Sequence, residues 1–239
     1  MTRHARHLAL AQVGAAGQRQ ISEASVLMIG VGGIGCAAAS YLASSGVGHI
    51  ILNDFDTVDE TNLGRQVLFG PDDVGKAKAA TAAARLTTLN PDVRISVLDE
   101  RLDAVAMAAA VAAVDLVLDG SDNFATRFLV NDACVSHDRC LVSGSAIRLE
   151  GQVAVFGPNY EVSPCYRCLY EDADESLENC AGNGVLAPVP GVIGTMMAVE
   201  ALKQLAGIAS PRGQLQLYDA GSGGFSSVTI SKRAACRSC

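Results

Sequence analysis

Residues 26–35 read VLMIGVGGIG, an apolar run that breaks into four glycines: Gly30, Gly32, Gly33 and Gly35. An apolar strand that leads through Gly-x-Gly-x-x-Gly into a helix is the pattern of a nucleotide-binding turn, because the glycines let the backbone approach a phosphate at the helix N-terminus. Asp54 follows at the end of the next apolar run, where a carboxylate can accept hydrogen bonds from ribose hydroxyls. These features suit NAD and ATP equally.

The order of patterns along the chain predicts an α/β fold. Strands are expected at 26–29, 49–54, 94–99 and 115–120, and helices at 33–45, 76–90 and 104–114. Strands that alternate with helices form a doubly wound, mostly parallel, Rossmann-like sheet. Further strands are expected at 141–146, 151–157, 215–220 and 226–231, a helix at 190–207 and a surface loop at 170–185. The links between the later strands are shorter, so these strands should extend the sheet in antiparallel fashion.

The composition argues against several classes of protein. The chain has 239 residues, of which 49% are hydrophobic, but no apolar stretch approaches the roughly 20 residues of a membrane span. A net charge of −7 and a pI near 5.0 argue against a nucleic-acid partner, which would need a basic face. The N-terminal stretch lacks the apolar core of a secretory signal, so we expect a cytoplasmic protein. Eight cysteines then indicate metal or thiol chemistry rather than structural disulfides.

The stretch after the expected ribose site favours ATP over NAD. Residues 54–66 read DFDTVDETNLGRQ and contain Asn62, Arg65 and Gln66, and Lys78 follows at the start of the next expected helix. Cations near the phosphates are what a site that displaces pyrophosphate needs, because negative charge builds on the leaving group. Hydride transfer has no such need.

A second acidic motif, DGSDNFATR at 119–127, follows a short apolar strand. Asp119 and Asp122 are therefore expected at the carboxyl end of that strand, where open α/β sheets bind their ligands. Carboxylates at this place suit Mg²⁺ that bridges phosphate oxygens. For Asp119 a turn cap explains the residue equally well, whereas Asp122, which Asn123 follows, is better explained as a ligand.

Two Cys-x-x-Cys pairs, CYRC at 165–168 and CRSC at 236–239, have the spacing of zinc knuckles. Together they predict a structural Cys₄ zinc site that fixes the C-terminal segment, with a dithiol or disulfide role as the alternative. Three other cysteines stand in apolar or turn surroundings and are expected to be buried as small hydrophobes: Cys36, Cys134 and Cys140. Cys180 lies in the polar stretch ENCAGNGV, where its thiol either handles sulfur or is incidental.

The glycine turn, residues 54–66, Lys78, DGSDN and the two cysteine pairs, in this order, resemble the ubiquitin-activating-like adenylyltransferases of the ThiF, MoeB and HesA type. The resemblance covers the chain from about Arg3 to Cys239. Bacterial members activate sulfur-carrier proteins for molybdopterin and thiamine synthesis. The stretch SGSAIRLEGQVAVFGP at 143–158 looks closer to the molybdopterin-synthase branch.

The resemblance implies an enzyme that uses ATP and Mg²⁺ to adenylate the C-terminal glycine of a small ubiquitin-like sulfur carrier ending in Gly-Gly. Pyrophosphate leaves, and the acyl-adenylate serves later thiocarboxylate formation. The implied nucleotide pocket consists of Gly30, Gly32, Gly33, Gly35, Asp54, Asp56, Asn62, Arg65, Gln66, Lys78, Asp122 and Asn123. The implied catalytic residues are Asp122, which would also hold Mg²⁺, Arg65, Lys78 and Arg6. Arg6 would reach the partner's ATP across the interface of a homodimer.

The same resemblance assigns zinc to Cys165, Cys168, Cys236 and Cys239. Cys180 matches a family cysteine that bonds to the activated carrier in the thiamine branch. The chain departs from the family pattern at Gly64, where a glutamine is usual, and at His4, where an aromatic residue is common. We expect no rhodanese-like sulfurtransferase domain after Cys239, and therefore a separate sulfur donor. The resemblance also divides the single expected domain, 1–239, into a nucleotide-binding half (about 1–140) and a carrier-binding and zinc half (about 141–239).

Other functions remain open from the sequence. The carrier of the thiamine pathway or of another thio-metabolite is an alternative to the molybdopterin carrier. An NAD(P)-dependent oxidoreductase would also explain the glycine turn and Asp54, but no histidine is evident as its acid or base. A non-catalytic, zinc-stapled partner-binding module is the third class, and the cations and Asp122 argue against it.

Overall fold

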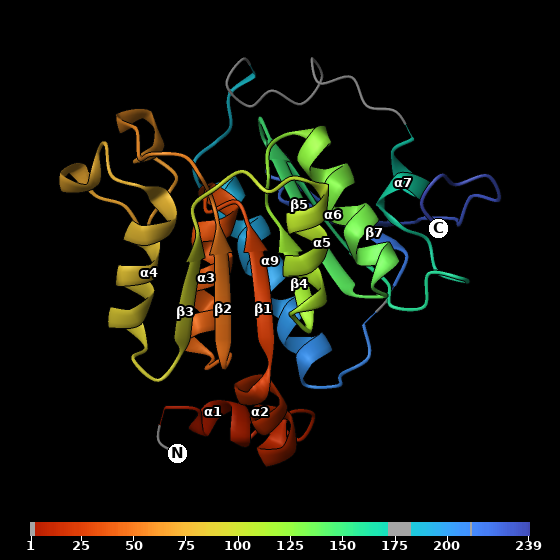
Figure 1. The fold of residues 1–239 in the computed structure, drawn as a ribbon, viewed down its shortest axis with the longest axis horizontal. Coiled ribbons are helices and arrows are strands. Elements are labelled where there is room, and N and C mark those ends of the chain that lie inside the picture. The colour runs from red at the N-terminus through yellow and green to blue at the C-terminus, as the bar shows by residue number, and fades with distance from the viewer. Residues whose placement is uncertain (1–2, 172–182, 211) are drawn as a thin grey trace.

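The computed structural model describes residues 3–171, 183–210 and 212–239. These residues form one eight-stranded sheet in the order β3-β2-β1-β4-β5-β6-β7-β8 (Figure 1). The parallel strands are β3 (Arg94–Leu98), β2 (His49–Asn53), β1 (Ser25–Ile29), β4 (Leu116–Asp119) and β5 (Cys140–Ile147). The antiparallel strands are β6 (Glu150–Phe156), β7 (Gln214–Asp219) and β8 (Gly224–Thr229). The expected doubly wound sheet with an antiparallel extension is therefore confirmed.

Helices cover both faces of the sheet, because the parallel strands are apolar on both sides. On one face lie α3 (Gly33–Ser44), α4 (Lys78–Leu89) and α9 (Pro188–Leu205), packed on strand residues such as Met28 and Leu118. On the other face lie α5 (Ala104–Ala112) and α6 (Phe124–Ser136), packed on Leu27 and Val117. Neighbouring residues of one strand thus serve two separate cores, as period-two alternation in a buried strand requires.

Shorter elements lie at the ends of the sheet. Helices α1 (Ala5–Leu8) and α2 (Gly14–Glu23) precede β1 and lie at the amino ends of the parallel strands (Figure 1). Two 3₁₀ turns, Glu60–Asn62 and Pro71–Asp73, connect β2 to α4. Helix α7 (Tyr166–Leu169) lies beside the C-terminal segment.

The expected strands and helices begin and end within two residues of the observed ones. Helix α6, by contrast, is not predicted by the sequence pattern. Its buried face includes Arg127 and Asn131 as well as Phe124 and Val130, so polar residues interrupt the apolar periodicity that would indicate a helix. The expected loop at 170–185 lies mostly outside the described residues.

No helix in the described part of the chain is long and apolar enough to cross a membrane.

Candidate nucleotide site and cysteine cluster

A cavity of about 300 Å³ opens at the carboxyl ends of β1, β2 and β4. Strand β1 lies between β2 and β4, so the chain leaves the middle of the sheet in opposite directions at this point. Such a switch point is where open α/β sheets bind ligands. Most of the residues expected at the nucleotide lie around this cavity: Gly30, Gly32, Gly33, Asp54, Asp56, Asn62, Arg65, Gln66, Lys78, Asp122 and Asn123.

The glycine turn forms the floor of the cavity, and its glycines differ in what they permit. Gly30 has a φ of +80°, which a residue with a side chain rarely adopts. A Cβ on Gly35 would lie 2.0 Å from the carbonyl oxygen of Gly30, so this glycine lets helix α3 approach the turn. Gly35 does not line the cavity. Gly32 does, and a Cβ there would meet nothing closer than 3.7 Å in the described part of the protein, which leaves room beside it for a ligand.

Asp54 is held at the end of β2 by the backbone. Its carboxylate accepts hydrogen bonds from the amides of Val31 (2.7 Å) and Asp56 (3.0 Å). Burial raises the pKa of Asp54, although these two hydrogen bonds act in the opposite direction. The carboxylate is thereby fixed beside the glycine turn, with lone pairs left over that can accept hydroxyl hydrogens.

Two cationic residues, Lys78 and Arg65, and the amide residue Gln66 line the cavity together with the glycine turn. Lys78, whose side chain is 9% exposed, places Nζ 3.0 Å from Oδ2 of Asp56. Arg65 donates from Nη1 to the carbonyl oxygen of Thr61 at 3.0 Å. Gln66 is buried, and its Oε1 atom finds no hydrogen-bond partner in the part of the chain that is described. Gln66 thus lines the cavity with hydrogen-bonding capacity that the described residues do not use.

The two aspartates at the end of β4 and in the loop after it, Asp119 and Asp122, have different surroundings. Asp119 is 1% exposed and accepts a hydrogen bond from the amide of Ser121 at 2.9 Å, and it does not line the cavity. Burial raises the pKa of this carboxyl. Of the two roles that the sequence left open for Asp119, ligand or turn cap, these contacts favour the turn cap. Asp122 is exposed to the cavity.

Asn123 has a local structural duty as well as a place at the cavity. Its side chain caps α6 by accepting a hydrogen bond from the amide of Thr126 at 2.9 Å. The start of α6 is therefore fixed next to Asp122, which precedes Asn123 in the chain.

Sequence reasoning missed Arg127, which also lines the cavity. This arginine is 4% exposed and donates to the carbonyl oxygen of Ser121 from Nη2 at 2.9 Å and from Nε at 3.3 Å. Its position four residues after the helix cap Asn123 was the available signal, because that spacing returns a side chain to the first turn of a helix. Phe55, which the guanidinium of Arg101 covers at 4.8 Å, was likewise missed.

Arg6 lies elsewhere. It is an exposed residue of α1, at the amino ends of the parallel strands, whereas the cavity lies at their carboxyl ends (Figure 1). Arg6 is not among the residues that line the cavity. A single copy of the chain, as far as it is described, therefore does not bring Arg6 to the nucleotide site.

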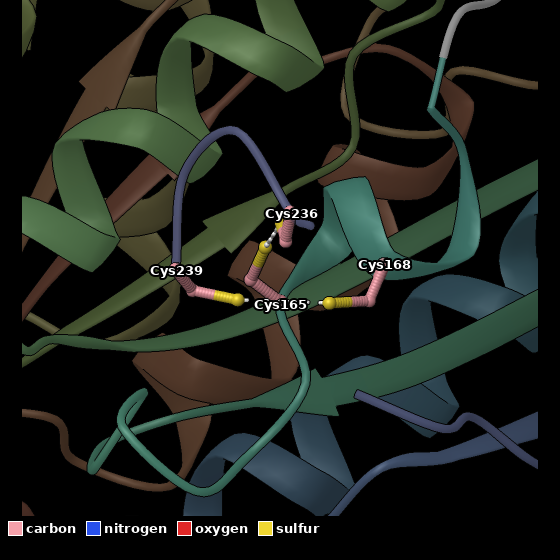
Figure 2. A group of neighbouring side chains, drawn as sticks. All are labelled: Cys165, Cys168, Cys236 and Cys239. Carbon is pink, nitrogen blue, oxygen red and sulfur yellow. Dashed lines mark hydrogen bonds between the residues drawn. The ribbon is translucent and has the colours of Figure 1, made fainter. Parts of the chain in front are cut away.

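The four paired cysteines converge, although the two pairs are far apart in the sequence. All four sulfur atoms lie within 4.8 Å of one another (Figure 2). The Sγ atoms of Cys165 and Cys236 are 3.5 Å apart, and those of Cys168 and Cys239 are 3.6 Å apart. Four sulfurs about 2.3 Å from a tetrahedral zinc would lie roughly 3.8 Å from each other, so the cluster fits zinc.

The remaining cysteines separate into two groups. Cys36, Cys134 and Cys140 are buried, as expected, and burial raises the pKa of Cys36 and of Cys140 to about 12. These thiols are protonated at neutral pH and pack as hydrophobes. Cys180 lies outside the described residues.

The cavity lies at a switch point of the sheet and is lined by the glycine turn, by a fixed carboxylate at the end of β2 and by two cationic side chains. This combination defines a nucleotide-binding α/β domain of the Rossmann class. Residues 4–238 match the model of the ThiF family, and the chain belongs to that family.

Curated relatives of this chain are named adenylyltransferases. The chain is 42% identical to the sulfur carrier protein ThiS adenylyltransferase of Escherichia coli K12 over 237 residues, which cover 99% of this chain and 94% of the relative. It is also 42% identical to the molybdopterin-synthase adenylyltransferase of the same organism over 240 residues, 100% of this chain and 96% of the relative. Identity to the adenylyltransferase and sulfurtransferase MOCS3 of Xenopus laevis is 43% over 99% of this chain, which spans 53% of that protein.

Solved structures show the same fold. The crystal structure of E. coli MccB with AMPCPP and selenomethionine MccA superimposes with a TM-score of 0.85 at 25% identity. That match covers 99% of this chain and 74% of MccB.

Proposed function

We propose that the chain uses ATP to adenylate the C-terminal glycine of a small ubiquitin-like sulfur-carrier protein. The two E. coli relatives are named a sulfur carrier protein ThiS adenylyltransferase and a molybdopterin-synthase adenylyltransferase, and both are matched over almost their full length. The observation that carries the proposal is the cavity in which Arg65, Lys78 and Asp122 surround the glycine turn. A nucleotide-binding turn with cations above it is suited to displacing pyrophosphate rather than to hydride transfer.

The residues divide the work by position. An ATP phosphate would lie on the glycine turn at the N-terminus of α3, and Asp54 would accept hydrogen bonds from the ribose. The terminal carboxylate of the carrier attacks the α-phosphorus, a new P–O bond forms, and the bond to the pyrophosphate oxygen breaks. Lys78 and Arg65 stabilise the charge that moves onto pyrophosphate. Asn62, Gln66 and Asn123 line the phosphates as hydrogen-bonding groups.

Magnesium and zinc have separate places. Asp122 is the exposed carboxylate at the cavity, and it would hold Mg²⁺, which neutralises charge on the phosphates. Asp56 lines the same pocket and accepts a hydrogen bond from Nζ of Lys78. The four cysteines would hold zinc, with no position open for substrate, so the metal fixes the C-terminal segment and takes no part in the chemistry.

The position of Arg6 supports a proposal about the assembly. Because this residue lies far from its own chain's cavity, we propose a homodimer in which Arg6 of each copy reaches the other copy's ATP. The half of the chain at about 1–140 then binds the nucleotide, and the half at about 141–239 binds the carrier and zinc.

The pathway completes the proposal. We place the reaction in the cytoplasm, with sulfur supplied by a separate donor, and favour the molybdopterin-type carrier over the thiamine-type one. Support for the former is the stretch at 143–158, while identity to the two E. coli relatives is the same. Purified chain given each carrier in turn, with the rate of adenylate formation compared at equal concentration, decides between the branches. A faster rate with the thiamine carrier would reverse the choice.

The nucleotide itself is tested by calorimetry. We expect ATP with Mg²⁺ to bind in the micromolar range or tighter, and NADH to show no binding at the same concentrations. Micromolar binding of NADH with no binding of ATP would replace the proposal with an oxidoreductase.

A further inference from the structure

Helix α6 has the nucleotide cavity at one end and the cysteine cluster along its side. Asp122, Asn123 and Arg127 at its start line the cavity. Asn131 and Asp132, one turn further along, contact the segments that carry the paired cysteines. One turn of helix is about 5.4 Å, so the two sites share a short rigid element.

The residues between the paired cysteines hold this helix. The amide of Tyr166 donates to Oδ1 of Asn131 at 2.8 Å. Arg167 donates from Nε and Nη2 to the two carboxylate oxygens of Asp132, each at 2.9 Å. Ser238, between the other two cysteines, donates to Oδ1 of Asp132 at 2.5 Å. Both cysteine pairs are thereby attached to α6.

Arg127 lines the cavity and also contacts Tyr166, which lies between two of the paired cysteines. The guanidinium of Arg127 donates from Nη1 to the hydroxyl oxygen of Tyr166 at 3.3 Å, and from Nη2 to the carbonyl oxygen of Ser121 at 2.9 Å. Tyr166 is 2% exposed, and its ring meets Phe128 and Phe156 edge to face. The ring therefore has little freedom, and its hydroxyl fixes one side of the arginine.

We infer that Tyr166 is a positioning residue that holds Arg127 at the cavity, and that the metal-bound cysteine cluster holds Tyr166. This inference rests on the proposed function, since it gives Arg127 a place in the adenylation site. A cation fixed from two sides loses little freedom when an anionic group binds to it. The cysteine cluster, which takes no part in the chemistry, would then still affect it through Tyr166.

The first test compares two buried tyrosines. Tyr166→Phe keeps the ring and removes the hydroxyl, and we expect kcat/KM for carrier-dependent ATP–pyrophosphate exchange to fall about tenfold, the usual effect of losing a hydrogen bond to a charged group. Tyr160→Phe is the control, because the Tyr160 hydroxyl donates to the carbonyl oxygen of Arg139 at 2.9 Å and not to Arg127. The control should keep wild-type exchange, and both variants should keep their zinc. Equal losses in the two variants, or no loss in Tyr166→Phe, overturn the inference.

A double-mutant cycle distinguishes positioning from general destabilisation. If Tyr166 acts through Arg127, Tyr166→Phe should cause less than a twofold further loss in an Arg127→Lys background, because neighbouring residues that act together are not additive. A full tenfold further loss contradicts the inference.

Hydrogen exchange supplies a readout that needs no turnover. Removing the metal from the wild-type protein should raise amide exchange across Phe124–Ser136 and leave α3 unchanged. Unchanged exchange in α6 overturns the link to the metal. If the wild-type chain shows no carrier-dependent ATP–pyrophosphate exchange, the proposed function is overturned instead. If the wild type is active and Tyr166→Phe has the same ATP–pyrophosphate exchange rate, this inference alone is overturned.

Discussion

The Nζ atom of Lys78 lies 3.0 Å from Oδ2 of Asp56 at the edge of the cavity. Lys78 is the first residue of α4, where the helix dipole disfavours a cation, and its side chain is 9% exposed. A nearly buried ammonium in that position needs an anion, and Asp56 supplies one in the protein alone. When ATP binds, its phosphates would take over this role, so the contact with Asp56 holds the Lys78 side chain in place for the nucleotide.

Replacing Lys78 by methionine tests this account of the cation. Methionine fills similar space without charge, and we expect Lys78→Met to lower the exchange rate by about 10²- to 10³-fold, as loss of one charge-stabilising donor does. Lys76→Met is the control, since Lys76 is 59% exposed and pairs with Asp73 instead. Exchange assays of both variants make the comparison. A loss of less than threefold in Lys78→Met would show that the cation is not needed.

Alanine substitutions at Gly32 and Gly35 should have different effects, one on ATP binding and the other on stability. Gly32→Ala should fold normally, because among the described residues the new Cβ meets only Gln66, at 3.7 Å, but it should weaken ATP binding by occupying the cavity. Gly35→Ala should lower the free energy of unfolding by about 1–3 kcal/mol or more, since its Cβ would lie 2.0 Å from a backbone oxygen. Urea unfolding and calorimetry measure the two effects. Normal ATP affinity in Gly32→Ala would place the phosphates elsewhere.

The cysteine cluster predicts a structural metal. We expect one zinc per chain by elemental analysis, and a chelator strong enough to remove it should lower the melting temperature without competing with ATP. Cys239→Ser should bind less zinc, whereas Cys36→Ser, at a buried cysteine outside the cluster, should keep the full amount. Protein that is metal-free as purified and insensitive to the chelator would contradict the zinc site.

Asp73 predicts a pH dependence of stability in the segment between β2 and α4. The amide of Gly70, then the side chains of Arg85 and Lys76, hold the pKa of Asp73 down at about 2. A carboxyl whose pKa is lower in the folded than in the unfolded state stabilises the fold above the unfolded value, about 4, and loses that effect as the pH falls toward 2. Asp73→Asn should therefore be less stable than wild type at pH 7, and the difference should shrink between about pH 4 and 2. Urea unfolding at several pH values measures it, and a difference that is constant with pH would rule out the ionised carboxylate as its cause.

The sequence was informative where chemistry follows local spacing. The glycine turn, the aspartate that ends the second strand and the paired cysteines each have a short signature, and the structure brings them to the expected places. Tertiary placement was less accessible: Asp119 and Asp122 are close neighbours in the chain, yet one caps a buried turn and the other faces the cavity. Helix α6 escaped detection because its buried face carries Arg127 and Asn131, polar residues whose partner Tyr166 lies on α7, distant in the sequence.

The most direct test of adenylation is ATP–pyrophosphate exchange with a small carrier protein that ends in Gly-Gly, measured for wild type and for Asp122→Ala. We expect exchange that requires the carrier, disappears when its terminal glycine is removed, and falls at least about 100-fold in Asp122→Ala. Because Asp122 is exposed, the variant should fold like wild type. Exchange that proceeds without the carrier, or that is unaffected by Asp122→Ala, would contradict the proposed mechanism.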